Sequence, residues 1–415
     1  MSAGPGTAGP AGTAGTAGTA GTAGTAGTAG ASTPQDVDDL RELHRELRDV
    51  ARDMLRKTTG RTGDDEAPVP VDWSLLAGSG WLGLEVPEEL DGAGATFAEV
   101  AVVLHEIGRA AASSGYLGSA VLGVGALRLL EPGAGRDELL AAVAAGEQRL
   151  AVALPAGDDV TIPFHVRPAT PGDAPGAGGG ARVDGTAGFV LDAAEADQLL
   201  LVALDPTGVP VVVRVRPDDP GVTVTGQPVV DETRSLGTVT VDGAVVDAGS
   251  VWQFGTDPQE SVRRLLDRAA LAVACDCLGL AEAMLEATVD YAGTRRQFGR
   301  PIGSFQAVKH ACADMFVRIS VGRELLAAGV AAVASDDPQA GVAVSRAKSY
   351  VCVAAVDVAG RAMQLHGGIG YTWEGGVHVY LKRALLGRAL FGAPAAHRAR
   401  LAARFAEPAD DPLTE

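Results

Sequence analysis

Two short stretches of the chain carry residue types that could bind a phosphate-bearing ligand. Arg295 and Arg296 are adjacent in Y-A-G-T-R-R-Q-F-G-R-P-I-G-S-F-Q-A-V-K-H (291–310), and an arginine fork can hold a pyrophosphate through two parallel charge-assisted hydrogen bonds. Gly367 and Gly368 follow in Q-L-H-G-G, where missing side chains would let the backbone approach a ligand closely. Each feature also has a purely structural interpretation, since cations oppose the dipole at a helix C-terminus and glycines end helices there.

The elements that must position these stretches change character twice along the chain. Residues 5–31 are mainly repeats of G-T-A, which predict a flexible tail, and from Asp36 to about Gln148 apolar residues recur at helical spacing. From Leu150 to about Val251, apolar runs alternate with D-G, P-G and D-P turn signals, a pattern typical of short antiparallel strands. The remainder predicts long helices again, near residues 259–293, 304–334, 338–365 and 378–405.

The order of these elements predicts an α+β multidomain protein. We expect Asp337-Pro338 to begin the third of the late helices and Gly367-Gly368 to end it. The expected parts are a disordered Gly/Thr/Ala repeat tail (1–35), an N-terminal helical domain (36–148), a middle antiparallel β domain (149–252), a C-terminal four-helix bundle (253–406) and a tail (407–415).

Composition limits the kinds of partner. The 415 residues are 47% hydrophobic, which predicts a sizeable core, and 52 acidic against 34 basic residues give a formal net charge of −18, which disfavours nucleic acid and anionic membranes as partners. No apolar run approaches the ~20 residues that span a bilayer and the first residues lack a signal-peptide pattern, so we expect a cytoplasmic protein.

Neither histidines nor cysteines show metal-ligand spacing, so no metal site is expected. The cysteines should be buried small hydrophobes: Cys275, Cys277, Cys312 and Cys352.

Three stretches of the chain resemble the acyl-CoA dehydrogenase family. They are W-L-G-L-E-V-P-E-E-L-D-G-A-G (81–94) with H-E-I-G-R (105–109), the R-x-x-F-G and P-I-x-x-F-Q pattern within 291–310, and Q-L-H-G-G-I-G-Y-T (364–372). Together with the order of helices, β domain and bundle, the resemblance covers about residues 36–405. It implies an FAD enzyme, usually a homotetramer or a dimer of dimers, whose flavin lies between the β domain, the bundle and a neighbouring subunit.

The resemblance also implies a reaction and a set of cofactor contacts. A carboxylate would remove the α-proton of an acyl thioester of coenzyme A, or of an acyl-carrier protein, while the β-hydrogen leaves as hydride to FAD. The product is a trans-2-enoyl thioester, and an electron-transfer flavoprotein or a similar acceptor takes the electrons. By position, the residues expected to bind FAD are Arg295, Arg296, Gln297, Phe298, Phe305, Gln306, Gln364, Gly367 and Gly368.

The sequence departs from the family where the catalytic base should stand. The Y-E-G-T stretch that usually carries the glutamate falls on Leu390-Phe391-Gly392-Ala393, so Phe391 occupies the glutamate position, and Arg398 matches the arginine that follows. A minority of the family places the glutamate on the first bundle helix, at a position that holds Ala269 here. Neither side chain can accept a proton, and loss of a general base typically costs ~10²- to 10⁴-fold in rate.

The nearest acid to these positions is Asp276. It follows Ala269 on the same helix face, about 10 Å farther along the axis, within an otherwise apolar stripe. Burial there could raise its pKa and make it a speculative base. We favour the other interpretation, in which a buried aspartate pairs with a neighbouring helix.

The β domain departs from the family as well. A-L-P-A-G-D-D-V (153–160) stands in place of an acidic, glycine-rich flavin-contacting stretch, and F-V-L-D (189–192) replaces the W-I-T-N loop. Phe189 and Leu191 therefore stand where the tryptophan and threonine usually contact the isoalloxazine ring. We expect altered flavin contacts in this region.

Chains without the base, with G-G-I-G-Y-T-W-E in this position, resemble one subunit type of heteromeric actinobacterial acyl-CoA dehydrogenases that act on bulky steroid-like or branched acyl-CoAs. The first hypothesis is therefore an FAD-dependent acyl-CoA dehydrogenase whose paralogous partner subunit supplies the glutamate. A self-sufficient dehydrogenase with a non-standard base such as Asp276, a flavin monooxygenase on the same fold, and a non-enzymatic scaffold stay open. The alanine- and glycine-rich helices predict a homo- or hetero-oligomer.

Overall fold

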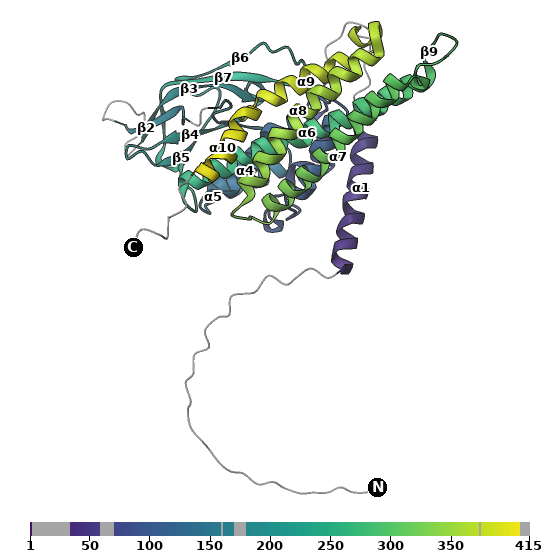
Figure 1. The fold of residues 1–415 in the computed structure, drawn as a ribbon. Coiled ribbons are helices and arrows are strands. Elements are labelled where there is room, and N and C mark those ends of the chain that lie inside the picture. The colour runs from purple at the N-terminus through teal and green to yellow at the C-terminus, as the bar shows by residue number, and fades with distance from the viewer. Residues whose placement is uncertain (2–33, 59–69, 159–160, 170–179, 373–374, 407–415) are drawn as a thin grey trace, which may run out of the picture. The chain divides into compact units, whose positions relative to one another are not determined.

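Helices lie before and after a block of strands, in the order that the sequence predicts (Figure 1). This computed structural model describes residues 1, 34–58, 70–158, 161–169, 180–372 and 375–406. Residues 43–415 form one compact unit, and residues 1–42 are a second, of which Met1 and the beginning of the first helix are described. Most of the predicted N-terminal tail and all of the predicted C-terminal tail lie outside the described residues.

The helices that precede the strands include one with a complete N-terminal cap. The Thr96 side chain accepts a hydrogen bond from the backbone of Ala98, and the Glu99 carboxylate reaches back to the backbone N–H of Thr96. This reciprocal cap fixes the start of α3. The helices of this part are α1 (Pro34–Thr58), α2 (Trp73–Gly78), α3 (Phe97–Arg109), the π-helix η3 (Leu117–Gly123), α4 (Val124–Arg128) and α5 (Ala134–Ala144).

The strands form a mixed sheet in the order β6-β7-β3-β2-β4-β5-β8, with β1 also paired to β4. Most neighbours are antiparallel, as predicted, but β1 and β2 both run parallel to β4, so the sheet is not purely antiparallel. The strands are β1 (Leu150–Ala153), β2 (Phe164–Pro168), β3 (Ala181–Leu191), β4 (Gln198–Leu204), β5 (Pro210–Val215), β6 (Val222–Gly226), β7 (Leu236–Val246) and β8 (Val251–Trp252).

The late helices pack around α8, which contacts α6, α7, α9 and α10. The Asp257 carboxylate accepts a hydrogen bond from the backbone N–H of Glu260 and so caps α6, with Pro258 at its first position. Gly367, with φ of 63°, ends α8 as predicted. The helices are α6 (Pro258–Thr294), α7 (Gln306–Ala334), α8 (Ala340–His366), α9 (Val377–Ala389) and α10 (Pro394–Ala406).

Two predicted helix boundaries in this part are wrong. The Asp337 side chain accepts a hydrogen bond from the backbone N–H of Gln339 within a turn, so α8 begins at Ala340 and not at Pro338. The helix predicted over 378–405 is two helices, because Phe391 and Gly392 take φ values of 55° and 91° that no α-helix contains.

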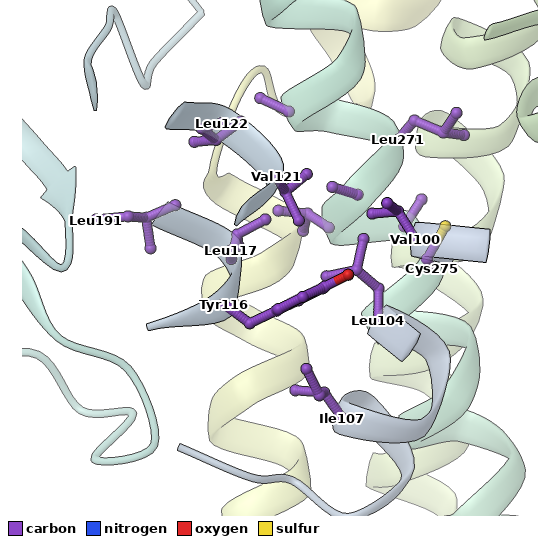
Figure 2. Close-up of a cluster of buried hydrophobic side chains, with 14 of the residues drawn as sticks. Val100, Leu104, Ile107, Tyr116, Leu117, Val121, Leu122, Leu191, Leu271 and Cys275 are labelled. Atoms are coloured by element: carbon purple, nitrogen blue, oxygen red, sulfur yellow. The ribbon is translucent and has the colours of Figure 1, made fainter. Parts of the chain in front are cut away.

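Helices α3 and α6 cross at very short range. A Cβ atom at Gly279 would lie 1.9 Å from the carbonyl oxygen of His105, and one at Gly108 would lie 2.0 Å from the carbonyl oxygen of Asp276. Only glycine fits at both positions. Beside this crossing, apolar side chains from α3, η3, β3 and α6 meet in one cluster (Figure 2).

Within that cluster the Tyr116 hydroxyl is buried, and no group of the described residues forms a hydrogen bond with it. Burial raises the pKa of this hydroxyl far above its usual range. Three of the cysteines, Cys275, Cys277 and Cys352, are buried as predicted, whereas Cys312 is only partly buried. Among the described helices, none has both the length and the apolar composition needed to cross a membrane.

Candidate functional site

The arginine-rich stretch forms a small hairpin between α6 and α7. Strand β9 (Arg296–Gln297) pairs with β10 (Arg300–Pro301). The hairpin lies where the end of α6 connects to the start of α7 (Figure 1). All side chains from Arg295 to Arg300 are exposed. The backbone N–H of Ile302 donates to the carbonyl of Arg295 at 2.8 Å and closes the base of the hairpin. The arginines are therefore held by a folded turn while their charged groups face solvent.

Phe298 occupies the tip of this hairpin in an unusual state. Its side chain is 91% exposed, and its backbone adopts a φ of 52°, a left-handed conformation that costs a bulky residue about 1–2 kcal/mol. Its ring meets Phe305 edge-on at 6.1 Å, and the Arg300 guanidinium lies over Phe305, 4.1 Å from the ring centre. An exposed aromatic in a strained backbone indicates a contact surface and not a core position.

The glycine turn lies at the same end of the bundle. Gln364, Gly367 and Gly368 are exposed, and a Cβ atom at either glycine would meet no other atom within 4 Å. Tyr291 near the end of α6 stacks on His366 at the end of α8, with ring centres 4.5 Å apart. The structure therefore brings together the two stretches that the sequence marks as candidate FAD contacts.

The described residues at this end suit the phosphate-bearing part of a dinucleotide. Arg295 and Arg296 offer several N–H donors in solvent, and the backbone at Gly367 and Gly368 is open to close approach. No acidic side chain of the described hairpin opposes the arginine charge. FAD would be held here through its pyrophosphate, with Phe298 as an apolar neighbour.

Both positions at which the resemblance places the glutamate are buried and apolar. Ala269 is fully buried within α6, and Phe391 is 7% exposed in the loop between α9 and α10. The backbone N–H of Phe391 donates to the carbonyl of Ala156 at 2.7 Å. Neither position presents a proton acceptor.

Asp276 is held by two arginines. Arg383 of α9 donates to its carboxylate through Nε at 2.9 Å and Nη2 at 2.5 Å, and Nη2 of Arg234 lies 3.0 Å away. Burial raises the pKa of Asp276, but the two guanidinium groups outweigh burial and hold its pKa below the ordinary value. The raised pKa considered for Asp276 is wrong, and the pairing with a neighbouring helix that we favoured is confirmed.

The H-E-I-G-R stretch serves to join helices. His105 lies 3.2 Å from Glu282 of α6, and Glu106 accepts two hydrogen bonds from Arg52 of α1 at 2.9 and 3.0 Å. Burial lowers the pKa of His105, but its two carboxylate neighbours outweigh burial and raise it. These residues form an ion-pair network beside the α3–α6 crossing.

The F-V-L-D segment, at the end of β3, has one exposed and several buried side chains. Phe189 is half exposed and its backbone N–H donates to the Gln227 side chain at 2.6 Å, whereas Leu191 is buried in the cluster of Figure 2. Asp192 is buried, and its carboxylate accepts the backbone N–H of Gly118 at 3.1 Å. Burial raises the pKa of Asp192 to about 7.

Asp192 also borders a cavity of about 290 Å³ between the early helices and β1, which sequence reasoning did not anticipate. His397 and Ser345, which lie behind the Phe391 loop, were likewise missed. The contacts of Asp192 with Gly118 and of His397 with Ser345 join segments that are far apart in the chain, so no spacing in the sequence connects them.

Comparison with known proteins decides the family. The family model of the acyl-CoA dehydrogenase N-terminal domain matches residues 38–147, and the family model of the C-terminal domain matches residues 260–406. The acyl-CoA dehydrogenase IpdE2 of Mycolicibacterium smegmatis is 31% identical over 332 residues, which are 80% of this chain and 86% of the relative. The chain belongs to the acyl-CoA dehydrogenase family. Its members are flavoproteins, and FAD-dependent dehydrogenation of acyl-CoA thioesters is the family activity.

Solved structures of family members include two with paired subunit names. One chain of the ChsE4-ChsE5 complex from Mycobacterium tuberculosis superposes with a TM-score of 0.77 and 28% identity, covering 89% of this chain and 98% of that one. A chain from a variant of the Tcur3481-Tcur3483 steroid ACAD gives a TM-score of 0.75 and 29% identity over 89% of this chain and 99% of that one. The resemblance to the acyl-CoA dehydrogenase family, drawn from the motifs, is confirmed.

Proposed function

We propose that this chain is one subunit of an FAD-dependent acyl-CoA dehydrogenase and that a paralogous partner subunit supplies the catalytic glutamate. The observation that carries the proposal is the buried, apolar state of Phe391 and Ala269 at the two base positions. Asp276 offers no replacement, since Arg234 and Arg383 occupy its carboxylate and hold its pKa below the ordinary value, which makes it a weak proton acceptor. A chain with no free carboxylate at these positions needs one from elsewhere to take the α-proton.

The cofactor motifs support a role across a subunit interface. FAD, when bound, supplies the hydride acceptor. Arg295 and Arg296 would hold its pyrophosphate, and Gly367 and Gly368 would let the backbone approach the dinucleotide. Because the hairpin side chains face solvent and not this chain's own β domain, a second subunit docked at this end would bring the rest of the flavin site.

The named pairs among the solved relatives support a heteromeric assembly and a bulky substrate. The ChsE4-ChsE5 structure is a complex of two named chains, and the Tcur3481-Tcur3483 protein is a steroid ACAD. We extend both properties to this chain as part of the proposal. The substrate class is then an acyl-CoA with a steroid-like or branched acyl group.

An anaerobic titration tests the proposal. The chain would be purified alone with added FAD, and also co-expressed with a paralogous dehydrogenase subunit, and each preparation titrated with straight, branched and steroid acyl-CoAs while flavin absorbance is followed. We expect bleaching only in the co-expressed preparation. Bleaching of the isolated chain would show that it contains its own base and would reject the partner role.

The self-sufficient alternative has a separate test at Asp276. If the isolated chain turns over, Asp276→Asn should abolish turnover while flavin stays bound. Asp267→Asn is the matched control, because Asp267 is a second buried aspartate on α6 and pairs with Arg400 at 2.9 Å. Equal losses in both variants would point to damage of the helix and not to loss of a base.

A further inference from the structure

The loop that holds Phe391 is tied to the segment after β1. The backbone N–H of Phe391 donates to the carbonyl of Ala156 at 2.7 Å, and the backbone N–H of Ala393 donates to the Asp158 carboxylate at 2.6 Å. Both acceptors belong to A-L-P-A-G-D-D-V, the stretch that by the resemblance stands in place of a flavin-contacting one. Two hydrogen bonds therefore span the place where a base would face a substrate lying on the flavin.

The same loop is held from behind by His397 of α10. Its Nε2 lies 3.0 Å from the carbonyl oxygen of Phe391, and its Nδ1 lies 3.2 Å from the Ser345 hydroxyl of α8. Burial lowers the pKa of His397 to about 4, so the ring is neutral at pH 7. A carbonyl can only accept, so Nε2 carries the proton and Nδ1 accepts from Ser345. A chain of hydrogen bonds thus runs from α8 through α10 to the loop.

The backbone of the loop fits this arrangement closely. A Cβ atom at Gly392 would lie 2.8 Å from Nε2 of His397, and φ of Gly392 is 91°, so glycine is required on both counts. Phe391 and Leu390 are buried at 7% and 3% exposure. Lys348, which is fully buried, donates to the carbonyl of Gly387 at 2.5 Å and holds the last turn of α9. These contacts hold the loop from Ala156, from His397 and, through the last turn of α9, from Lys348.

We propose that segment 390–393 is a latch that closes this chain's own reaction centre, so that no flavin ring or thioester lies between its β domain and its bundle. The inference rests on the proposed function and adds that the missing carboxylate is not the only obstacle. A planar ring or an acyl thioester placed there would have to separate Phe391 from Ala156 and break the Asp158 contact. The arginine hairpin, whose side chains are exposed, stays available to a flavin bound in the partner subunit.

Residue-resolved hydrogen exchange on the full-length chain tests the latch without any turnover. We expect slow exchange of the Phe391 and Ala393 amides, unchanged when FAD or an acyl-CoA is added. Asp158→Ala should speed exchange at Ala393 by several-fold, up to about ten-fold, because it removes the charged acceptor. Asp205→Ala is the matched control, since Asp205 caps a distant turn by accepting from Thr207 at 2.8 Å. Fast exchange in the wild type, or a change on ligand addition, would overturn the latch.

A second experiment restores the carboxylate. Phe391→Glu, reconstituted with FAD, should show no flavin bleaching with any acyl-CoA of the panel, and Phe391→Leu controls for loss of the aromatic ring. Bleaching by Phe391→Glu but not by wild type would reject the latch and leave the partner role intact. Bleaching by wild type would instead reject the partner role. If the glutamate variant does not fold, the exchange measurements on Asp158→Ala decide alone.

Discussion

The ring of Tyr291 stacks on the imidazole of His366, with ring centres 4.5 Å apart and planes inclined by 20°. Tyr291 precedes the arginine hairpin by one helical turn, and His366 directly precedes the glycine turn, so this one contact connects the two candidate cofactor stretches. The His366 Nδ1 also lies 2.8 Å from the carbonyl of Ala362, which fixes the ring on α8. The stack therefore packs the end of α6, just before the hairpin, against the end of α8, just before the glycine turn.

We predict that Tyr291→Leu loosens both stretches together. Aromatic pairs contribute about 0.5–1.5 kcal/mol beyond their buried area, so overall stability should fall by about 1 kcal/mol. Hydrogen exchange should increase both at 295–305 and at 367–371. Tyr291→Phe keeps the stacked ring and should behave like the wild type. Faster exchange in the hairpin alone would mean that the stack does not couple the two segments.

Phe298→Gly should reduce the amount of bound flavin while it leaves the stability of the protein nearly unchanged. Glycine relieves the left-handed backbone at φ 52° but adds freedom to the unfolded chain, and the side chain is 91% exposed, so stability should change by less than about 1 kcal/mol. Flavin retained per complex after gel filtration should fall. Phe298→Asn, which tolerates the same conformation, should give the same result. Full flavin retention in both variants would remove Phe298 from the cofactor surface.

The pattern of apolar residues and turn signals was enough to predict the order of helices and strands. Local signals also sufficed for the start of α6, where an Asp-Pro cap operates within one turn, and for the end of α8 at Gly367. The break between α9 and α10 carried a signal as well, since Gly392 and Pro394 stand close together. The helical spacing on both sides of Phe391 led to one long helix instead.

Contacts between distant segments could not be predicted. The parallel pairing of β1 with β4 joins strands that are separated by β2 and β3 in the chain, and no local signal specifies it. The arginines around Asp276 lie on a β-domain loop and on α9, and no periodicity relates them to α6. The motifs could be assigned to FAD only by resemblance, while the closure of the Phe391 loop became visible only with Ala156 and Asp158 in place.

Gly279→Ala should destabilise the protein by forcing α3 and α6 apart at their crossing. Its Cβ would lie 1.9 Å from the backbone oxygen of His105, and backbone atoms on both helices would have to move, which should cost at least about 1–3 kcal/mol. Gly360→Ala on α8 is the control, because its Cβ would meet no atom within 4 Å, and it should stabilise the protein by about 0.5–1 kcal/mol. Urea denaturation of both variants measures the difference, and equal stabilities would contradict the close crossing.

Asp192 should make the protein less stable as pH rises towards neutrality. Burial raises its folded pKa to about 7, against the opposing charge of Arg234, while an unfolded aspartate titrates near 4. The folded state therefore binds the proton more tightly, and its stability is highest below about pH 4 and falls by up to about 1.4 kcal/mol per pH unit until about pH 7. Asp192→Asn can still accept the Gly118 N–H and should lack this slope.

The measurement is the free energy of unfolding in urea at pH 5, 6, 7 and 8, compared between wild type and Asp192→Asn. The free energy of unfolding of the variant should increase relative to that of the wild type up to about pH 7. Above pH 7 the difference between the two should stay constant. Glu282 does not affect this comparison. Burial raises its pKa, but His105 and Arg323 outweigh burial and hold the pKa of Glu282 at about 2. Its contribution to the free energy of unfolding is therefore lost only as pH falls below about 4.5. A constant difference between the two proteins across this range would show that Asp192 is already ionised at pH 5, and that its contact with the π-helix holds a charged carboxylate.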